Sequence, residues 1–203
     1  MFNISVTSQI MDLDDLKLDT ILSALGDQLA TQGERFEIVV VGGSALLVLG
    51  LVTRTTKDID VVALADKGVL RSSEPLPETL RASADRVARD FGLSEDWLNS
   101  GPTDLLRLGL PEGFWSRIIT RRYGDVLSAH FASRVDQVHF KLFAMVDQGG
   151  GRHEADLRAL RPTRDELIAA AKWTITHDPS PGFREVLSEA LNHLGVEDVD
   201  LGP

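Results

Sequence analysis

The sequence lacks the features that define several classes of protein. It contains no cysteine, so it can form neither a disulfide nor a zinc site built on thiolates. It has 21 lysine and arginine residues and 31 acidic residues. The resulting net charge of −10 argues against a broadly basic surface that binds nucleic acid. No apolar run approaches the roughly 18–20 residues of a membrane span, and no early segment resembles a secretory leader. We therefore expect a cytoplasmic protein.

Three common motifs of nucleotide binding or nucleophilic catalysis are also missing. The sequence holds no P-loop of the form G-x-x-x-x-G-K-[ST] and no G-x-G-x-x-G fingerprint. The G-x-S-x-G elbow of serine hydrolases is absent too, because the stretch that begins at Gly42 lacks the final glycine. Any phosphate or nucleotide chemistry must therefore depend on another pattern.

Residues 39–64 supply such a pattern. The apolar run 39–41 leads into Gly42, Gly43 and Ser44 and then into a helical segment at residues 45–49, which predicts a strand, a turn and a short helix. Glycines allow a phosphate to approach the backbone, and a new helix offers free N–H groups. We therefore expect Gly42, Gly43 and Ser44 to form a phosphate cradle.

Two acids follow in an otherwise apolar strand. Asp58 and Asp60 are separated only by Ile59, so in a strand both carboxylates face one way while Ile59 faces the core. Two like charges at this spacing repel each other, and a divalent cation shared with a phosphate relieves the repulsion. The pair therefore predicts a Mg²⁺ site.

The remaining patterns predict a small mixed sheet with many helices, an α/β (α+β) fold. We expect a sheet-containing part at residues 1–135, including an N-terminal helix, and a helical C-terminal part at 136–203. Residues 66–78 are predicted as a loop, 94–116 as irregular turns, and 118–123 with 126–131 as a hairpin. Helices are predicted from Asp12 or Asp14 to residue 32, ended by Gly33, and then at residues 78–91, 136–148, 153–160, 165–176 and 183–194.

The Gly-Gly-Ser turn, followed by Arg54-x-Thr56-x-Asp58-Ile59-Asp60, resembles the signature of the polymerase-β-type nucleotidyltransferases. The resemblance implies that residues 1–135 form a nucleotidyltransferase core. It implies that the Gly42-Gly43 turn holds a nucleoside triphosphate and that Asp58 and Asp60 bind Mg²⁺. The expected reaction transfers a nucleoside monophosphate to an acceptor hydroxyl.

Two further stretches are similar to the abortive-infection nucleotidyltransferases, the AbiEii and MenT toxins of toxin–antitoxin pairs. One is Trp97-Leu98-Asn99 with Leu110-Pro111-Glu112-Gly113, and the other is Phe140-Lys141-Leu142-Phe143-Ala144 with Asp156-Leu157. This closer resemblance implies a toxin that modifies RNA, with the 3′ end of tRNA as the expected acceptor. It also implies a partner antitoxin.

Four more charged residues are candidates for the site. Lys141 can reach the triphosphate as a point charge, or it can be a solvated helix lysine. Asp156 can orient Lys141, act as the base for the incoming hydroxyl, or pair with a neighbouring arginine. Arg54 and Lys57 can contact phosphate or pair with nearby acids.

The sequence departs from the superfamily pattern in its third metal-binding carboxylate. The strands predicted at 118–123 and 126–131 hold no acid in their interiors. Asp125 falls in the turn between them, and His130 stands where an acid is expected. We expect that Asp125 or Asp156 substitutes, or that the second metal binds weakly or activity is reduced.

The remaining polar residues do not decide which acceptor is used or whether the protein is catalytic. Residues 107–164 carry ten basic against six acidic residues, which is either a solvated face or a track for a polyanionic acceptor. His130, His139 and His153 are interpreted as structural or surface residues, and Trp97 and Asn99 as packing and capping residues. A non-catalytic nucleotide-binding or protein-interaction module is one alternative, and a small-molecule nucleotidyltransferase of the aminoglycoside-modifying kind is another. The arginines of the possible track are Arg117, Arg121, Arg122 and Arg134.

Overall fold

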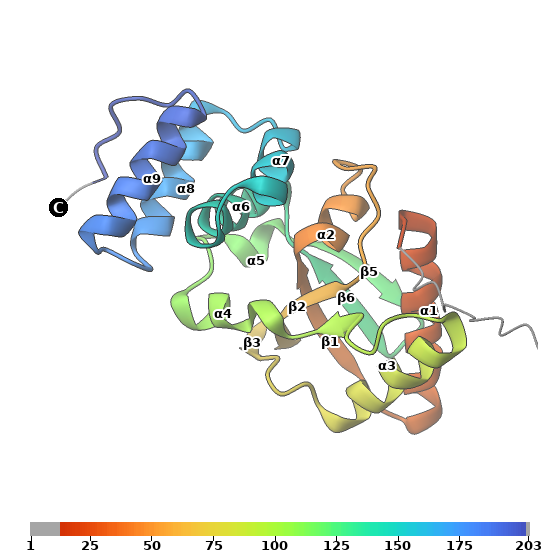
Figure 1. Ribbon diagram of the computed structural model, residues 1–203. Helices are drawn as coiled ribbons and strands as arrows, with labels where there is room; N and C mark the ends of the chain where they lie inside the picture. The colour runs from red at the N-terminus through yellow and green to blue at the C-terminus, as the bar shows by residue number, and fades with distance from the viewer. Residues whose placement is uncertain (1–12, 202–203) are drawn as a thin grey trace, which may run out of the picture.

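The computed structural model describes residues 13–201 and shows a central sheet with helices on both faces (Figure 1). In chain order the elements are α1 (Asp15–Gln32), β1 (Phe36–Val41), α2 (Gly42–Val48), β2 (Ile59–Asp66), β3 (Val69–Ser72), α3 (Glu78–Phe91), β4 (Leu98–Asn99), the 3-10 turn η1 (Gly101–Thr103), α4 (Asp104–Leu108), α5 (Phe114–Arg117), β5 (Ile119–Tyr123), β6 (Leu127–Phe131), α6 (Arg134–Gln148), α7 (Gly151–Ala159), α8 (Arg164–Ile175) and α9 (Pro181–His193). The predicted mixed α/β class is confirmed. No helix within residues 13–201 is both long and apolar enough to span a bilayer.

The sheet is mixed and has the strand order β3-β2-β1-β6-β5. β1 pairs antiparallel with β2 and parallel with β6, and β5 with β6 forms the predicted hairpin. β4 pairs in parallel with the first two residues of β2. β1 therefore lies at the centre, and its C-terminal end leads directly into Gly42.

Two strands contradict the sequence-based expectation of loop and irregular structure. β3 follows β2 through a two-residue turn in which Lys67 has φ 50° and Gly68 has φ 84°. Tight hairpin turns with two positive φ values usually carry Asn-Gly or Asp-Gly, so Lys-Gly gave no clear signal. β4 has only two residues and exists because β2 offers it an edge.

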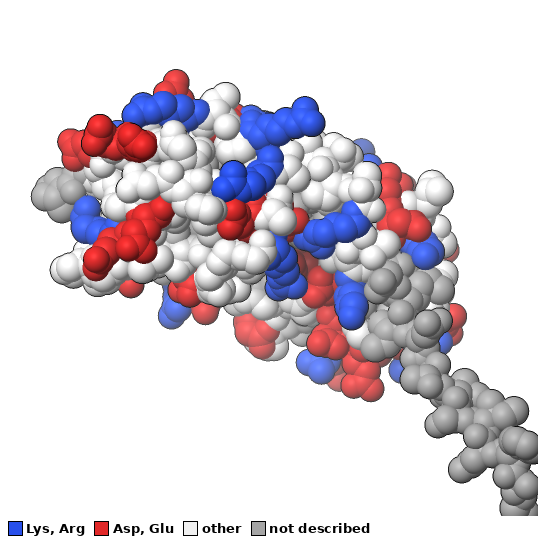
Figure 2. Space-filling model, turned by 45° about the horizontal axis from the view of Figure 1, so that its top comes forward, with Lys and Arg blue, Asp and Glu red and all other residues white. Residues whose placement is uncertain are grey.

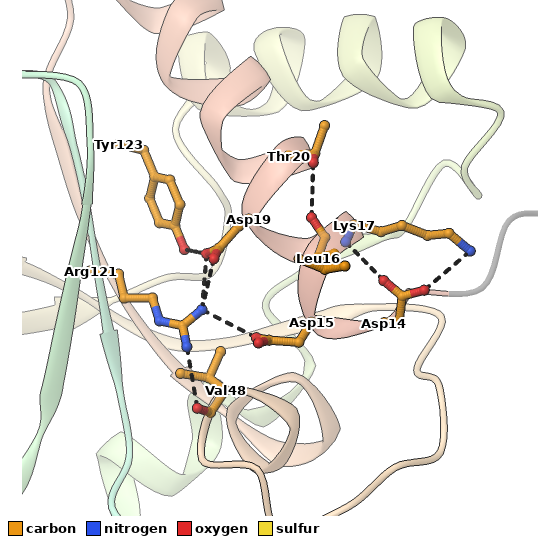
Figure 3. Close-up of polar contacts among 9 residues, drawn as sticks. All are labelled: Asp14, Asp15, Leu16, Lys17, Asp19, Thr20, Val48, Arg121 and Tyr123. Atoms are coloured by element: carbon orange, nitrogen blue, oxygen red, sulfur yellow. Dashed lines mark hydrogen bonds and ion pairs between the residues drawn. The ribbon is translucent and has the colours of Figure 1, made fainter.

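The N-terminal helix follows its sequence signals closely. Asp14 caps α1 by accepting a hydrogen bond from the Lys17 amide at 2.9 Å, and Gly33 ends it at φ 70°. Figure 3 shows Arg121 of β5 donating to Asp15 and Asp19 of α1. The same guanidinium donates to the carbonyl of Val48 at the end of α2, so one side chain joins three elements.

Buried apolar side chains form three clusters around the sheet. One lies between the sheet and α1 with α3, and a second lies on the opposite face against α5 and Phe140 of α6. The third is formed by α6 to α9 and includes Leu46 of α2. α2 is therefore held between the sheet and the C-terminal helices, with its first residues at the end of β1.

Candidate active site

The two predicted acids lie at the start of β2, beside the end of β1. Asp60 is the pairing partner of Val41, the residue before Gly42. Ile59 is completely buried in the cluster under α1, so the acids on either side of it face away from that cluster. Asp58 accepts a hydrogen bond from the hydroxyl of Thr56 at 3.1 Å. The pairing with Val41 thus places the Asp60 carboxylate next to the glycine turn, and Asp58 directly precedes the same strand.

Gly42 and Gly43 leave the space that these side chains occupy. A Cβ on Gly42 would lie 2.5 Å from Oδ2 of Asp60, and Gly42 has φ +73°. A Cβ on Gly43 would lie 3.0 Å from the hydroxyl of Thr56. The turn therefore needs glycine for contact with the acidic strand, a constraint that comes in addition to any phosphate contact.

Asn99 of β4 holds Asp60 from the other side. Its Nδ2 donates to Oδ1 of Asp60 at 3.2 Å. Burial and the neighbouring charge of Asp58 raise the pKa of Asp60, whereas Asn99, Lys141 and Arg152 oppose that rise. A carboxylate whose charge is disfavoured in this way gains from a nearby cation.

Asp156 of α7 connects Lys141 to Arg54. Its Oδ2 lies 2.8 Å from Nζ of Lys141 and 2.6 Å from Nη2 of Arg54. Arg54 also donates from Nε to Oδ1 at 3.0 Å, so this pair is bidentate. The structure therefore brings together three predicted site residues from the loop after α2, from α6 and from α7.

The environment of Asp156 favours the orienting role over the role of a base. Burial raises the pKa of Asp156, but the hydrogen bonds from Arg54 and Lys141 outweigh burial and bring the pKa below its ordinary value. Both carboxylate oxygens already accept hydrogen bonds from cations. A carboxylate in this state binds a substrate proton poorly.

A cleft of about 560 Å³ opens beside Asp60. Residues of η1, α4, α6 and the start of α7 line it. Gly42, Asp60 and Lys141 also line it. The lining residues that sequence reasoning did not assign to the site include Arg107, Gln137, Phe140, Phe143, Arg152 and His153.

Two of these missed residues carry buried polar atoms without partners. Neither side-chain atom of Gln137 has a hydrogen-bond partner among the described residues, and Nδ1 of His153 has none either. Burial lowers the pKa of His153, with Lys141 and Arg152 adding to the effect. His153, which the sequence indicated to be a structural or surface residue, lines the cleft. A sequence alone cannot show that a histidine or glutamine lacks partners.

Several predicted residues are not part of the cleft lining: Gly43, Ser44, Arg54, Lys57, Asp58, Asp125 and Asp156. Ser44 is fully buried in α2, and its hydroxyl has no hydrogen-bond partner within residues 13–201. Lys57 is exposed. Asp125 lies in the turn before β6, and since Phe36 pairs with Leu127, it lies roughly 20 Å or more along the strand direction from Gly42. Asp125 cannot take the place of a third metal carboxylate, which corrects that expectation.

β1 separates β2 from β6, so neither strand of the predicted hairpin lies beside Asp60. His130 of β6 contacts Glu37 at 3.0 Å and Thr120 at 2.8 Å, away from the acids. The strand next to Asp60 is β4, where Asn99 stands. Among the described residues, no group of three or more acidic or histidine side chains is placed to hold a metal. A donor set of two carboxylates still suits Mg²⁺, which is commonly held by one or two carboxylates plus substrate phosphates.

The arginines of the possible acceptor track are mostly engaged within the fold. Arg117 pairs with the buried Asp136 at 2.6 Å, and Arg121 pairs with Asp15 and Asp19. Arg134 pairs with Glu166 and donates to a backbone carbonyl. Only Arg122 is exposed without a partner in the part of the chain that is described. The four arginines therefore do not form a continuous track.

Other cations lie closer to the cleft. Figure 2 shows lysine and arginine side chains gathered in the middle of the face that carries α7 and the loop after α2. Lys57 and Arg152 belong to these segments, and neither makes an ion pair or hydrogen bond with the described residues. Arg152 lines the cleft, whereas Lys57 is exposed outside its lining.

Comparison with known proteins identifies one family. Residues 17–151 match a family described as "Nucleotidyltransferase of unknown function (DUF6036)". No curated protein and no solved structure matches the chain. The matched range contains the sheet, the Gly42 turn, both acids and Lys141.

Proposed function

The chain belongs to this family of nucleotidyltransferases of unknown function, and on that premise we propose that it transfers a nucleoside monophosphate from a triphosphate to an acceptor hydroxyl. The observation that carries the proposal is the packing of Gly42 against Asp60, which places a glycine turn and two acids at one end of the sheet. A cleft wide enough for a nucleotide begins at the same residues.

The proposed reaction is an in-line displacement at the α-phosphorus. The acceptor oxygen forms a bond to this phosphorus and its hydroxyl proton passes to solvent, while the bond to the bridging oxygen of the β-phosphate breaks and pyrophosphate leaves. Asp58 and Asp60 would hold Mg²⁺, which supplies charge neutralisation to the triphosphate when bound. The backbone at Gly42 and Gly43 lets the phosphates approach, and Lys141, fixed by Asp156, adds a positive charge.

The acceptor proposed is RNA, with the 3′ end of tRNA as the specific candidate. This part of the proposal rests on the resemblance to the abortive-infection toxins. The same resemblance leads us to propose a partner antitoxin. Arg152 of the cleft lining and the exposed Lys57 are cations available for RNA phosphates. A cationic small molecule is the competing acceptor, because Asp147 also lines the cleft and three of the four track arginines are paired internally.

The test uses purified protein with Mg²⁺, each labelled nucleoside triphosphate in turn, and total RNA or an aminoglycoside as acceptor. We expect RNA to be labelled, and we expect Asp58→Asn and Asp60→Asn to abolish the label. Asp66→Asn is the matched control, since Asp66 is an exposed acid at the far end of the same strand. Binding of a triphosphate without labelling of any acceptor would refute transfer.

A second candidate function is a nucleotide-binding or protein-interaction module without catalysis. The observation in its favour is that the two carboxylates have no third acidic partner in the described region. Such a module would keep its effect on growth in a Lys141→Met variant, whereas a transferase would lose it. Overexpression of the wild type and of Lys141→Met in the same host separates the candidates.

A further inference from the structure

The parallel pairing of β4 with β2 fixes Asn99 beside Asp60. The two residues are direct partners in the register, so their side chains lie on the same face. Asn99 donates from Nδ2 to Oδ1 of Asp60 at 3.2 Å and accepts at Oδ1 from the amide of Gly101 at 2.9 Å. Only this orientation of the amide satisfies both contacts, because a flipped amide would put oxygen against carboxylate and donor against donor.

The local packing holds this amide in place. A Cβ on Gly101 would lie 3.0 Å from Oδ1 of Asn99, so any larger residue at position 101 would crowd the Asn99 amide. On the other side, Oδ2 of Asp60 faces the Gly42 turn. The Asp60 carboxylate is thus held between Asn99 and Gly42, with one oxygen bound by an uncharged donor.

We propose that Asn99 is a positioning residue that holds Asp60 for a divalent cation and keeps the metal affinity of the free site low, so that the cation binds together with the triphosphate. The proposal rests on the metal site of the proposed function. A carboxylate at position 99 would add a third negative charge beside Asp60. The Asn99 amide holds Asp60 in place by a hydrogen bond without adding that charge.

The charges around the site support this order of binding. Two carboxylates face the cation, whereas Lys141 and Arg152 line the same cleft and repel it. A triphosphate neutralises these cations and brings oxygen ligands of its own. Mg²⁺ bound by one or two carboxylates and substrate phosphates is the usual arrangement for sites of this composition.

The direct test measures Mn²⁺ binding by electron paramagnetic resonance in the absence of nucleotide. We expect weak binding by the wild type and at least tenfold tighter binding by Asn99→Asp. Asn192→Asp is the matched control, because it adds the same charge at an exposed position on α9. Equal Mn²⁺ affinity of Asn99→Asp and Asn192→Asp would overturn the proposal, as would tight binding by the wild type alone.

Thermal unfolding with inorganic triphosphate provides a second readout. We expect the Tm of the wild type to rise with Mn²⁺ and triphosphate together but not with Mn²⁺ alone. The Tm of Asn99→Asp should rise with Mn²⁺ alone. Asn99→Leu, which removes the donor, should weaken the joint effect several-fold. This variant keeps the proposal testable if Asn99→Asp does not fold, and an unchanged joint effect in Asn99→Leu contradicts it.

These measurements need no acceptor. If Asn99→Asp gains Mn²⁺ affinity while no acceptor is ever labelled, transfer fails and the role of Asn99 stands. If acceptors are labelled while Asn99→Asp behaves as Asn192→Asp, only the role of Asn99 fails.

Discussion

The ammonium group of Lys141 lies 2.8 Å from Oδ2 of Asp156, and the two side chains are only 9% and 3% exposed. Arg54, the other partner of Asp156, is 44% exposed. Because their exposure differs, Arg54 and Lys141 respond differently to the removal of Asp156. Arg54 can return to water, whereas Lys141 without Asp156 would remain a buried charge without its counterion.

We predict that Asp156→Asn destabilises the protein more than Lys141→Met does. The first change leaves Lys141 unpaired, at a cost of about 3–5 kcal/mol for a buried pair broken on one side. The second change leaves Asp156 bound by Arg54. The measurement is urea unfolding of both variants, with the double variant expected between them. Equal destabilisation by the two single changes would show that Lys141 is not held by Asp156.

The stabilisation by Asp156 should depend on pH. The lowered pKa of Asp156 means that its charge favours the folded state above the ordinary carboxyl value of 3.8. As pH falls through the still lower pKa of the folded state, the contribution is lost. The difference in unfolding free energy between the wild type and Asp156→Asn should therefore be full at pH 7 and shrink below about pH 4. A difference that stays constant from pH 7 to pH 3 would contradict the ion-pair account.

Local signals made much of the fold predictable. Gly33 and the apolar stripe before it predicted α1, and the alternation around Ile59 predicted which way both acids face. The residues 78–91 proposed as a helix are those of α3. Such features depend on neighbours within a few positions, which a sequence displays directly.

The missing parts of the site depend on contacts between distant segments. β4 forms only against β2, so the position of Asn99 beside Asp60 could not be inferred from the two residues of that strand. Asp125 fits the sequence pattern of a substitute acid, but the parallel pairing of β6 with β1 puts it at the wrong end of the sheet. The unpaired amide of Gln137 is likewise a property of packing, which no local motif records.

Gly42→Ala should impair nucleotide and metal binding well beyond the effect of a strained backbone. The new Cβ would meet Oδ2 of Asp60 at 2.5 Å and push the carboxylate away. Gly33→Ala is a close control, because Gly33 has φ +70° but no atom within 4 Å of the added Cβ. Both variants should lose stability through the positive φ, while only Gly42→Ala loses triphosphate binding in calorimetry. Loss of binding in both variants would mean that the Asp60 contact is not the cause.

Gln137→Met should stabilise the protein. Both polar atoms of this fully buried amide lack partners among residues 13–201, and each such group costs about 1–3 kcal/mol. Methionine fills similar space without polar hydrogen-bonding demands, so Tm should rise by at least roughly 2–4 °C. Gln148→Met, at an exposed position on the same helix and cleft, should leave Tm unchanged. A lower Tm for Gln137→Met would indicate that the amide has a partner, such as an internal water, in solution.

Arg121→Met should loosen the contact between α1, β5 and the end of α2 (Figure 3). The guanidinium lies 3.0 Å from Asp19 and 3.3 Å from the carbonyl of Val48, and methionine keeps only the apolar stem. We expect a loss of about 1–3 kcal/mol and weaker triphosphate binding, because α2 carries the Gly42 turn at its other end.

Arg122→Met tests whether the weaker triphosphate binding of Arg121→Met comes from the lost hydrogen bonds of Arg121 or from the lost positive charge. Arg122 follows Arg121 on β5, has the same charge, and is exposed with no ion pair to the described residues. Its removal should change neither Tm nor triphosphate affinity measurably. If both variants weakened binding equally, the loss would reflect positive charge near the protein surface. A selective loss in Arg121→Met would instead show that the turn is held in place from the far end of α2.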